Sequence, residues 1–402
     1  MSDVSSTKRI LEALPAEALE GKRAVVRVDF NVPLADGAVA DYTRIRASLP
    51  TIRWLQRAGC RVILLSHLGR PKGRVRPECS LRPVAAALED ELGVPITFID
   101  DPPSEDARAA SRHLKRGEIA LVENTRFLEG EETNDPAVAE VFASLGDFYV
   151  NDAFGTAHRA HASTVGIASR LSPAVAGFLM AKELEFLGSA LASPRRPFVA
   201  VIGGAKISGK IDVLEALLPQ VDQILVGGAM ACTFFAALGC QVGNSLVEPA
   251  KVELAGTLFG RADGKIVLPS GATIARELRP DAQTRQVSRD AIPEGWAVYD
   301  LDRASAELFA GIIRSAATVV WNGPMGVFET PPFDAGTRAI AAAMAEATSR
   351  GATTIVGGGD SAAALAQAGL QDAVTHVSTG GGASLEFLKG KPLPGVAALD
   401  DA

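Results

Sequence analysis

The chain has few cysteines and no long hydrophobic run. Only Cys60, Cys79, Cys232 and Cys240 occur among its 402 residues, and no two of them have the C-x-x-C spacing, so a reduced, cytoplasmic setting is expected. No uninterrupted apolar stretch reaches the length of a membrane span. The first residues carry acidic groups early and lack an apolar core, so neither a signal peptide nor a transit peptide is expected.

The sequence also lacks an excess of positive charge. Its net charge is -7 and its pI is near 5.4, which argues against nucleic acid as a partner, because a nucleic-acid surface carries a basic stripe. Local clusters must therefore bind any anionic ligand. Histidine is rare too, with five in the chain. His158 and His161 are three residues apart, but no cysteine or acid completes a metal-ligand set beside them.

What the sequence does contain is a rhythm of short, apolar, β-branched runs separated by helix-length segments. Nearly all-apolar strands that alternate with helices indicate parallel sheets covered on both faces. The predicted fold is therefore α/β, with two doubly wound, Rossmann-like lobes joined by a helix and a cleft between the lobes. The runs lie at 24–28, 62–66, 119–123 and 148–151 in the first half and at 198–204, 223–228, 265–269, 318–323 and 353–359 in the second.

The two lobes are predicted to meet near residues 191–198, where two prolines and two arginines interrupt the periodicity. Before this break, Leu184, Leu187 and Leu191 fall on one stripe of a helix, which we interpret as the connecting helix. We expect an N-terminal domain at 1–182, the connecting helix and hinge at 183–197, and a C-terminal domain at 198–375.

Glycines follow apolar runs repeatedly in the second half. Glycines at strand ends let the backbone approach phosphate, and the helices that begin there offer unpaired N–H groups. These turns therefore predict a nucleotide site. The G-x-G-x-x-G pattern with a later acid that marks NAD-dependent oxidoreductases is absent. The turns are Gly203-Gly204, Gly227-Gly228, Gly357 to Gly359, and Gly380 to Gly382.

Lys206 and Lys210 lie in the first of these turns, in the stretch GGAKISGKI. On a helix they would share a face in the first turn, where the helix dipole disfavours cations. Either a bound polyphosphate supplies the missing negative charge, or both are solvated lysines offset by Asp212. The stretch also matches G-x-x-x-x-G-K, but Ile211 stands where that motif needs a metal-binding hydroxyl, so we interpret the match as accidental.

Asp360 follows the triple glycine and is a candidate for two roles. It is the expected helix N-cap, a purely structural role. It is also a candidate Mg²⁺ ligand, because a carboxylate beside bound phosphate needs a bridging cation. Asn322, Pro324 and Glu329 in WNGPMGVFE are further candidates, with Glu329 for a ribose hydroxyl.

The first half carries basic and polar residues at the ends of its apolar runs. Arginine binds phosphate and carboxylate oxygens through a planar fork, so several arginines at strand ends of one sheet predict an anion pocket. Arg46 alone is expected to be solvated. No catalytic base is evident, which suits phosphoryl transfer to an already ionised carboxylate. The pocket residues are Asp29, Asn31, Arg44, His67, Arg70, Arg126, His158, Arg159 and His161.

Eight motifs in order resemble the phosphoglycerate kinase family: RVDFNVP, SHLGRP, ENTRF, NDAFGTAHRAHAS, GGAKIS, WNGPMGVFE, GGGD and HVSTGGGASLE, from about Arg27 to Glu386. The resemblance implies reversible, Mg²⁺-dependent transfer between 1,3-bisphosphoglycerate with ADP and 3-phosphoglycerate with ATP, in glycolysis and gluconeogenesis. It implies a cytoplasmic monomer that bends at a hinge, with small molecules and no membrane or nucleic acid as partners. It also implies that 376–402 returns to the N-terminal domain.

The family's site residues carry over position by position. Arg44 matches the arginine that stabilises the transferring group, Asp360 the Mg²⁺ ligand, and Glu183 and His376 a hinge pair. The implied catalytic residues are Arg44, Lys206, Gly359 and Gly382. The implied 3-phosphoglycerate contacts are Asp29, Asn31, Arg44, His67, Arg70, Arg126 and Arg159. The implied nucleotide contacts are Gly203, Lys206, Lys210, Gly227, Gly228, Asn322, Pro324, Glu329, Gly357, Gly358, Gly359, Asp360 and Ser361.

Departures from the family pattern gather where the base would bind. Ala229 stands for a common glycine, and Ser361 for a common threonine. Val298 and Tyr299 replace a glycine and a leucine and add bulk where adenine is expected to lie, so base preference stays open. A catalytically weak, nucleotide-binding relative with a regulatory role is the alternative hypothesis.

Overall fold

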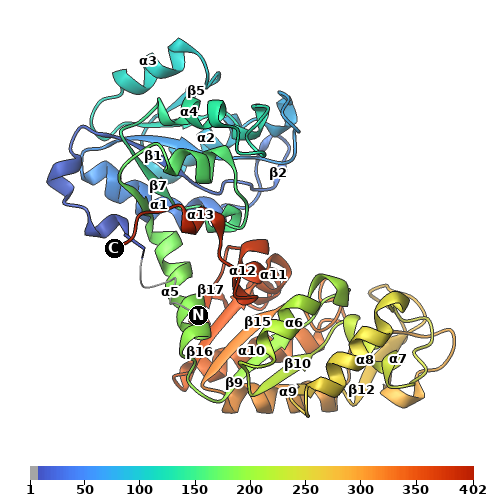
Figure 1. The fold of residues 1–402 in the computed structure, drawn as a ribbon. Helices are drawn as coiled ribbons and strands as arrows, with labels where there is room; N and C mark the ends of the chain where they lie inside the picture. Colours follow the sequence, from blue (N-terminus) through green and yellow to red (C-terminus); the bar gives the residue numbers. More distant parts are fainter. Residues whose placement is uncertain (1–7) are drawn as a thin grey trace. The chain divides into compact units, whose positions relative to one another are not determined.

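The computed structural model describes residues 8–402 and divides into two compact units, each built on its own sheet (Figure 1). The first unit runs up to Gly188 and takes in Pro392–Ala402, and the second is Ser189–Lys391. Both main sheets are parallel, so the predicted α/β class with two parallel sheets is confirmed. The domain boundaries expected at 182, 197 and 375 stay predictions. No helix within 8–402 is both long and apolar enough to span a bilayer.

The first sheet has the strand order β5-β6-β4-β1-β7-β8, and all neighbours are parallel. Its central strands are buried apart from the first residues of β1 and β4, which explains their nearly continuous apolar sequences. The edge strands β5 and β8 were not predicted, because β5 is partly exposed and β8 has only three residues. The bounds are β1 Arg23–Arg27, β4 Arg61–Leu65, β5 Ile96–Ile99, β6 Ile119–Val122, β7 Phe148–Asn151 and β8 Ala174–Ala176.

Helices α1 and α2 cover one face of this sheet. Ile52 of α1 and Leu88 of α2 belong to one buried core with Val26 and Val62 of the strands. Each such side chain contributes about 1.5–3 kcal/mol on burial. Of the predicted stripe in α5, Leu184 and Leu187 are buried and Leu191 is half-buried. The bounds are α1 Thr43–Arg57, α2 Arg82–Leu92, α3 Glu105–His113, α4 Pro136–Ala143, α5 Phe178–Ala192 and α13 Pro394–Ala397.

The second sheet has the order β11-β10-β9-β15-β16-β17, again with parallel neighbours. In chain order within this sheet it reads 3-2-1-4-5-6, so the direction of winding switches between β9 and β15, where ligands bind in such sheets. The bounds are β9 Phe198–Ile202, β10 Gln223–Val226, β11 Ile266–Val267, β15 Thr318–Asn322, β16 Thr353–Gly357 and β17 His376–Val377.

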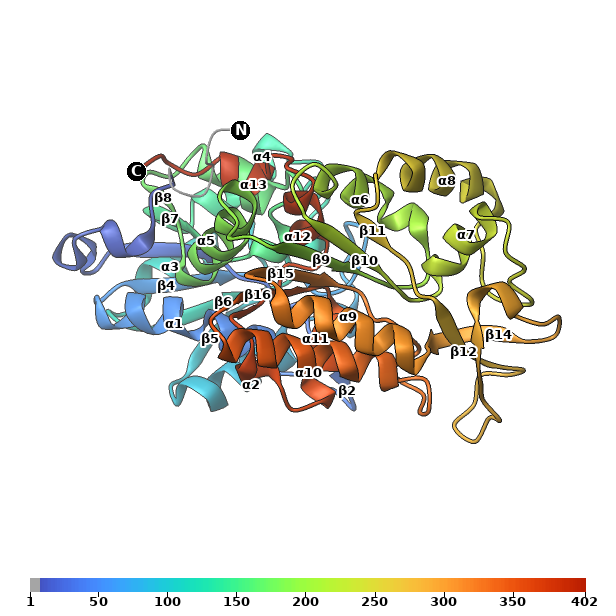
Figure 2. The same ribbon diagram turned by 90° about the horizontal axis from the view of Figure 1, so that it is seen from below.

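Helices cover both faces of the second sheet. Helices α9, α10 and α11 lie on one side of it, and α6 lies on the other (Figures 1 and 2). Trp321 of β15, Phe309 of α9 and Ile340 of α10 form part of one buried core. The bounds are α6 Ile211–Leu217, α7 Met230–Ala237, α8 Val252–Arg261, α9 Arg303–Ser315, α10 Ala335–Ser349, α11 Gly359–Gln367 and α12 Gly382–Leu388.

Two antiparallel elements interrupt the alternation of strands and helices, and neither was predicted. β12 (Gly271–Ala275) pairs with β13 (Arg285–Ser288) and β14 (Ala297–Leu301). The first unit has a short hairpin of β2 (Leu34–Ala35) and β3 (Ala38–Val39). Strand β13 is largely exposed and polar, so its sequence gives none of the apolar signal on which the strand predictions relied.

Candidate functional site

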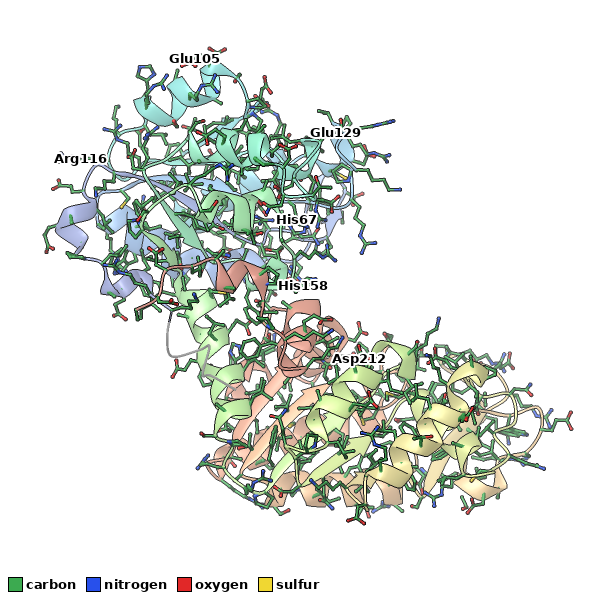
Figure 3. All side chains as sticks on the ribbon, viewed as in Figure 1. His67, Glu105, Arg116, Glu129, His158 and Asp212 are labelled. Atoms are coloured by element: carbon green, nitrogen blue, oxygen red, sulfur yellow. The ribbon has the colours of Figure 1, made fainter. Side chains whose placement is uncertain are left out.

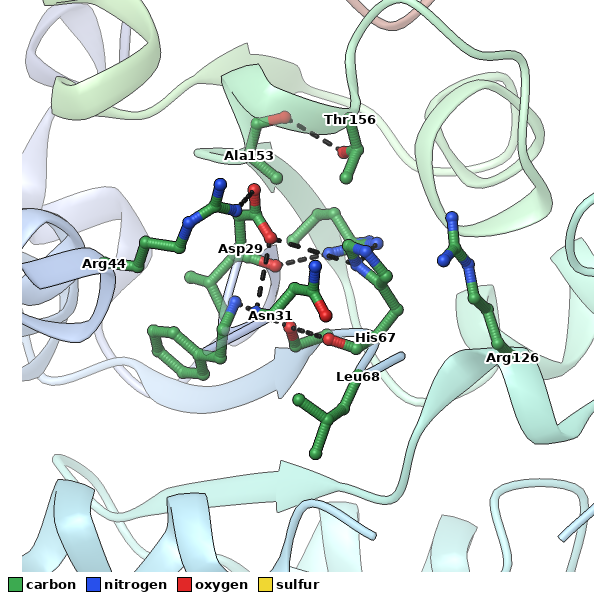
Figure 4. A network of polar contacts seen from close by, with 12 residues as sticks. Asp29, Asn31, Arg44, His67, Leu68, Arg126, Ala153 and Thr156 are labelled. Atoms are coloured by element: carbon green, nitrogen blue, oxygen red, sulfur yellow. Dashed lines mark hydrogen bonds and ion pairs between the residues drawn. The ribbon is translucent and has the colours of Figure 1, made fainter. Parts of the chain in front are cut away.

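The first candidate site lies at the carboxyl edge of the first sheet. β6, β4, β1 and β7 are parallel neighbours, so the residues that follow these strands come together at one edge. Asp29 and Asn31 follow β1, His67 follows β4, and Arg126 follows β6 in the turn Thr125–Phe127 (Figure 4). The structure thus brings together four of the residues that were predicted to form an anion pocket.

Asp29 and Arg44 form an ion pair at this edge. Arg44 Nη1 donates to Asp29 Oδ2, and Arg44 is placed there by the start of α1, where Asp41 Oδ1 accepts the N–H of Thr43 at 2.8 Å. The Arg44 side chain keeps 34% of its surface exposed, whereas Asp29 keeps 10%. Part of the Arg44 guanidinium therefore still faces solvent and is available to an anion.

The loop after β4 is held from two sides. Asn31 Oδ1 accepts the N–H of Gly69 at 2.9 Å, and Arg126 Nη1 donates to the carbonyl of Gly69 at 2.8 Å. Arg126 Nε also pairs with Glu132 Oε1 at 3.2 Å. Burial lowers the pKa of the Arg126 guanidinium, while Glu132 opposes that effect. Because a guanidinium keeps its proton in proteins, Arg126 is a fixed cation beside His67.

The remaining basic residues lie at the margin or outside this cluster. Arg70 and Arg159 are exposed, and His158 is half-buried. His67 and His158 lie toward the same side of the first unit in Figure 3. Arg46, in contrast, pairs with Glu91 at 2.8 Å on the outer surface of α1, in the solvated position expected for it.

Beneath the cluster lies a buried charged network that was missed at the sequence level. Arg27 is 0% exposed and donates through Nε to Ser163 Oγ at 2.9 Å. Ser163 Oγ in turn donates to Oε1 of the fully buried Glu131 at 2.5 Å. The only signal in the sequence was an arginine that ends an otherwise apolar strand. Ser163 lies 136 positions after Arg27, and Glu131 lies 32 positions before Ser163.

His67 and His161 are neutral. Burial first, and then the charges of Arg27, Arg126 and Arg44, hold the pKa of His67 well below its usual value. Burial and the same Arg27 and Arg126 charges lower the pKa of His161 to about 3. Neither His67 nor His161 therefore adds positive charge to the pocket at neutral pH.

The second candidate site lies at the switch between β9 and β15. Gly203 N donates to the Asn322 carbonyl and Gly204 N to the Pro324 carbonyl, both at 3.0 Å. A Cβ on Gly203 would lie 2.1 Å from the Pro324 carbonyl oxygen, and one on Gly228 would lie 2.5 Å from Gly204 N. The turns after β9, β10 and β15 therefore interlock through their backbones, which requires glycine independently of any ligand.

Lys210 is bound at this switch by Asn322. Its Nζ donates to the Asn322 carbonyl at 2.7 Å and to Oδ1 at 2.6 Å. Burial lowers the pKa of the Lys210 amine to about 8, although Asp360 acts in the opposite direction. The prediction that both lysines lie in the first turn of a helix is wrong. Lys206 is extended and exposed before the turn Ile207–Gly209, and α6 begins only at Ile211.

The start of α11 faces the same switch. The prediction that Asp360 is the N-cap is wrong, because the N-cap is Gly358 with φ +90°. A left-handed φ favours glycine there, and Asp360 falls in the first turn, exposed to solvent. Ser361 is fully buried and its Oγ accepts the N–H of Gly323 at 2.6 Å. Ser361 thus fastens the turn after β15, whereas Asp360 is left facing solvent.

Other expected nucleotide contacts surround these residues. Asn322 Nδ2 is a buried donor with no hydrogen-bond partner in residues 8–402, and it would lie 3.2 Å from a Cβ on Gly358. Gly359 and Gly382 are exposed at the starts of α11 and α12. Pro324 is half-buried and Glu329 is exposed. The arrangement offers an ammonium group, an amide donor and backbone N–H groups, which together suit phosphate oxygens.

Comparison with known proteins identifies the family. The family model described as phosphoglycerate kinase matches residues 14–391. This chain belongs to the phosphoglycerate kinase family. The phosphoglycerate kinase of Chloroflexus aggregans is 57% identical over 388 residues, which cover 95% of this chain and 97% of that protein. That of Thermosipho africanus is 53% identical over 385 residues, which cover 95% and 96%. Membership makes the chain an enzyme, a kinase of glycolysis.

Solved structures of the phosphoglycerate kinase family agree with this fold. The structure of phosphoglycerate kinase from Coxiella burnetii matches with a TM-score of 0.87 at 41% identity, covering 97% of this chain and 98% of that one. The one from Pyrococcus horikoshii matches with a TM-score of 0.85 at 31% identity, with the same coverage. Both confirm the predicted fold class.

Three of the positions at which this chain departs from its family lie around β14 and α7. Ala229 is the N-cap residue of α7. Val298 N donates to Ser245 Oγ at 3.0 Å, and the ring of Tyr299 lies 5.0 Å from that of Phe333, centroid to centroid. Tyr299 and Val298 are both half-buried, so the added bulk is anchored in the fold.

The expected hinge residues of the phosphoglycerate kinase family are both buried. Glu183 in α5 is 0% exposed and His376 at the start of β17 is 4% exposed. Their role stays a prediction.

Proposed function

We propose that this kinase transfers a phosphoryl group reversibly between 1,3-bisphosphoglycerate with ADP and 3-phosphoglycerate with ATP. One observation carries the proposal. At one sheet edge the guanidinium groups of Arg44 and Arg126 gather with the neutral His67 and the amide of Asn31. Such forked and single donors suit the oxygens of a small phosphorylated acid.

The acid is proposed to bind at this edge. Arg126 and Arg44 supply fixed positive charge, His67 and Asn31 supply uncharged polar groups, and the exposed Arg70 and Arg159 complete the rim. Asp29 holds Arg44 in place through their ion pair. The full proposed set is Asp29, Asn31, Arg44, His67, Arg70, Arg126 and Arg159.

The nucleotide is proposed to bind at the β9–β15 switch of the second unit. Lys206 and Lys210 would neutralise its phosphates, and the unpaired Asn322 Nδ2 supplies a donor close to Gly358. Glu329 is proposed to contact the ribose. The full proposed set is Gly203, Lys206, Lys210, Gly227, Gly228, Asn322, Pro324, Glu329, Gly357, Gly358, Gly359, Asp360 and Ser361.

The residues present fit a magnesium ion that arrives with the nucleotide. No group of three or more His, Cys, Asp or Glu side chains that could hold a metal occurs among residues 8–402, so a cage made only of protein is not offered there. Mg²⁺ commonly uses one or two carboxylates and completes its shell with phosphate oxygens and water. Asp360, exposed beside the Lys210 amine, is the carboxylate proposed to hold it. When bound, the ion would neutralise phosphate charge.

Catalysis is proposed to rest on positioning and charge neutralisation. The acceptor carboxylate is already ionised, so no side chain needs to remove a proton from it. Arg44 and Lys206 keep exposed cationic surface, and are proposed to stabilise the charge on the phosphoryl group during in-line transfer. The backbone N–H groups at Gly359 and Gly382 are proposed to assist.

Direct transfer needs the acid, proposed on the first unit, and the nucleotide, proposed on the second, to be brought to one place. Hinge bending at Glu183 and His376 therefore belongs to the proposal, as do the boundaries 1–182, 183–197, 198–375 and 376–402. We also propose a monomer that works in the cytoplasm. The four cysteines are free thiols, which supports a reducing compartment.

The deciding experiment measures turnover of the full chain with 3-phosphoglycerate and MgATP, beside GTP, CTP and ITP. We expect ADP release that depends on 3-phosphoglycerate. Absence of turnover with every nucleotide would overturn the proposal. If nucleotide binding persisted without turnover, the weak regulatory relative would be the correct description.

A further inference from the structure

Arg27 is a buried cation without a direct ion pair among residues 8–402. All three of its nitrogens are engaged: Nε donates to Ser163 Oγ, Nη1 to the carbonyl of Val28, and Nη2 lies 3.2 Å from His67 Nδ1. Burial of a charge is costly unless other groups stabilise it. Here the compensating charge, Glu131, is reached only through Ser163. The remaining donor of this arginine points at a histidine of the proposed acid site.

This contact fixes the tautomer of His67. A guanidinium donates hydrogen bonds and accepts none, so His67 Nδ1 must be the acceptor, and the ring proton lies on Nε2. Asp29 Oδ1 would favour a proton on Nδ1, but it lies 4.0 Å from that nitrogen, too far for a hydrogen bond. Its partner oxygen, Oδ2, is occupied by Arg44.

The charges around the ring favour the same neutral form. Arg27, Arg126 and Arg44 face His67 together with His161, and Asp29 is the acid that lies 4.0 Å from its Nδ1. A further positive charge on the ring would be desolvated and repelled by three guanidinium groups. His67 therefore remains an uncharged donor–acceptor group.

The opposite nitrogen is left for a ligand. His67 Nε2 has no hydrogen-bond partner in the described part of the chain, yet it is not one of the buried unpaired atoms there. It therefore keeps a solvent-accessible surface, although the side chain as a whole is only 6% exposed. An N–H group in that position would donate to an anion that enters the pocket.

We propose that Arg27 is a positioning residue that holds His67 in its Nε2–H form, so that His67 donates to an oxygen of the acidic substrate at any pH near neutrality. The identity of that substrate rests on the proposed function. The tautomer itself does not, so the two can fail separately.

The tautomer is tested directly on the full chain with ¹⁵N-labelled histidine. Two-bond ¹H–¹⁵N correlations distinguish the two neutral tautomers and the imidazolium, and a His67→Gln variant assigns the signal among five histidines. We expect the Nε2–H form throughout pH 5.5–8. An imidazolium or an Nδ1–H tautomer in that range would overturn the proposal. This measurement needs neither turnover nor an altered Arg27.

The role in binding is tested with Arg27→Met, with Ser163→Ala as its matched control. Arg27→Met removes the donor to Nδ1, while burial and the charges of Arg126 and Arg44 still disfavour the imidazolium. The Nδ1–H tautomer of His67 should therefore become populated, and KM for 3-phosphoglycerate should rise about tenfold. Ser163→Ala disturbs the same network but keeps the Arg27–His67 contact, so neither the tautomer nor KM should change. Equal rises of KM in both variants, with no change of tautomer in Arg27→Met, would show that Arg27 is only a structural residue.

Discussion

Lys210 Nζ lies 2.7 Å from the main-chain oxygen of Asn322 and 2.6 Å from its side-chain oxygen. The lysine that follows β9 is thus fastened to the end of β15, across the point where the sheet reverses its winding. Its partner is a neutral amide, so its positive charge remains available to a phosphate. We therefore expect the Lys210–Asn322 contact to affect both the stability of the fold and the pH dependence of nucleotide binding.

The first prediction is proton uptake when nucleotide binds. The pKa of Lys210 is lowered from 10.5 to about 8 in the free fold, so at pH 9 the amine is mostly neutral, and a bound polyphosphate should restore its charge. Uptake should rise from near zero at pH 7 toward about one proton at pH 9. Calorimetry of nucleotide binding in buffers with different ionisation enthalpies measures it. Lys210→Arg, which keeps its proton, should abolish the rise, and an unchanged rise would contradict the assignment.

The two lysines should respond differently to truncation. Lys206 is exposed and its side chain makes no hydrogen bond within residues 8–402, so Lys206→Ala should lower kcat more than tenfold, about 1.4 kcal/mol, without loss of stability. Lys210→Ala should lower the free energy of unfolding as well, by about 1–2 kcal/mol, because two oxygens of Asn322 lose their donor. Steady-state kinetics and urea unfolding of both variants check this. A change in KM alone for Lys206→Ala would make it only a binding residue.

Two glycines of the stretch GGAKISGKI should differ sharply in their tolerance of substitution by alanine. Gly203→Ala places a Cβ 2.1 Å from the Pro324 carbonyl oxygen and 2.4 Å from Met325 Cε, which forces the β15 turn to move. We expect a loss of about 2–4 kcal/mol of stability and much weaker nucleotide binding. At Gly209 nothing lies within 4 Å of an added Cβ, so Gly209→Ala should leave melting temperature and activity nearly unchanged. Equal behaviour of the two variants would refute the interlocking of the turns.

Arg44 and Arg46 form a matched pair two residues apart on α1. Arg44 pairs with Asp29 at the proposed acid site, whereas Arg46 pairs with Glu91 on the outer surface. Arg44→Ala should lower kcat at least tenfold through lost stabilisation of the transferring group. Arg46→Ala should leave both stability and kinetics nearly unchanged, because an exposed ion pair contributes little. Comparable kinetic losses in both variants would remove Arg44 from the site.

A buried carboxylate should make the first unit pH-sensitive. Asp152 Oδ1 accepts the N–H groups of Leu179 and Met180 at the start of α5, at 2.9 and 3.3 Å. Burial raises the pKa of Asp152 from 3.8 to about 7, so the fold binds a proton that the unfolded chain releases above pH 4. The free energy of unfolding should therefore fall as pH rises from about 4 to 7, by up to about 1.4 kcal/mol per unit.

Asp152→Asn keeps the acceptor oxygen and should remove that slope, as measured by urea unfolding at pH 5 and 7.5. Asp135→Asn is the control, because Asp135 caps α4 from an exposed position and should leave the slope unchanged. A slope retained in Asp152→Asn would show that another group titrates.

Much of the architecture could be predicted because parallel strands that are buried on both faces have a recognisable apolar sequence. Strands β1, β4, β9 and β15 have apolar centres because both faces of the sheet are covered there. Strand β13 could not be found in this way, because it is largely exposed and mostly polar. It is a strand because its backbone pairs with β12. Edge strand β8 is too short to show a period.

The sequence by itself determined which chemistry is present and roughly where. Polar and basic residues directly after buried strands, such as Asp29 and His67, must meet at one edge, because parallel strands end together. Only the tertiary structure decided what each group does there. Arg27 sets the His67 tautomer and Asn322 holds Lys210, because hydrogen bonds join atoms that the chain brings together from 40 and 112 positions away. Likewise, Gly203 is required by a carbonyl from another strand end, a contact that no local pattern encodes.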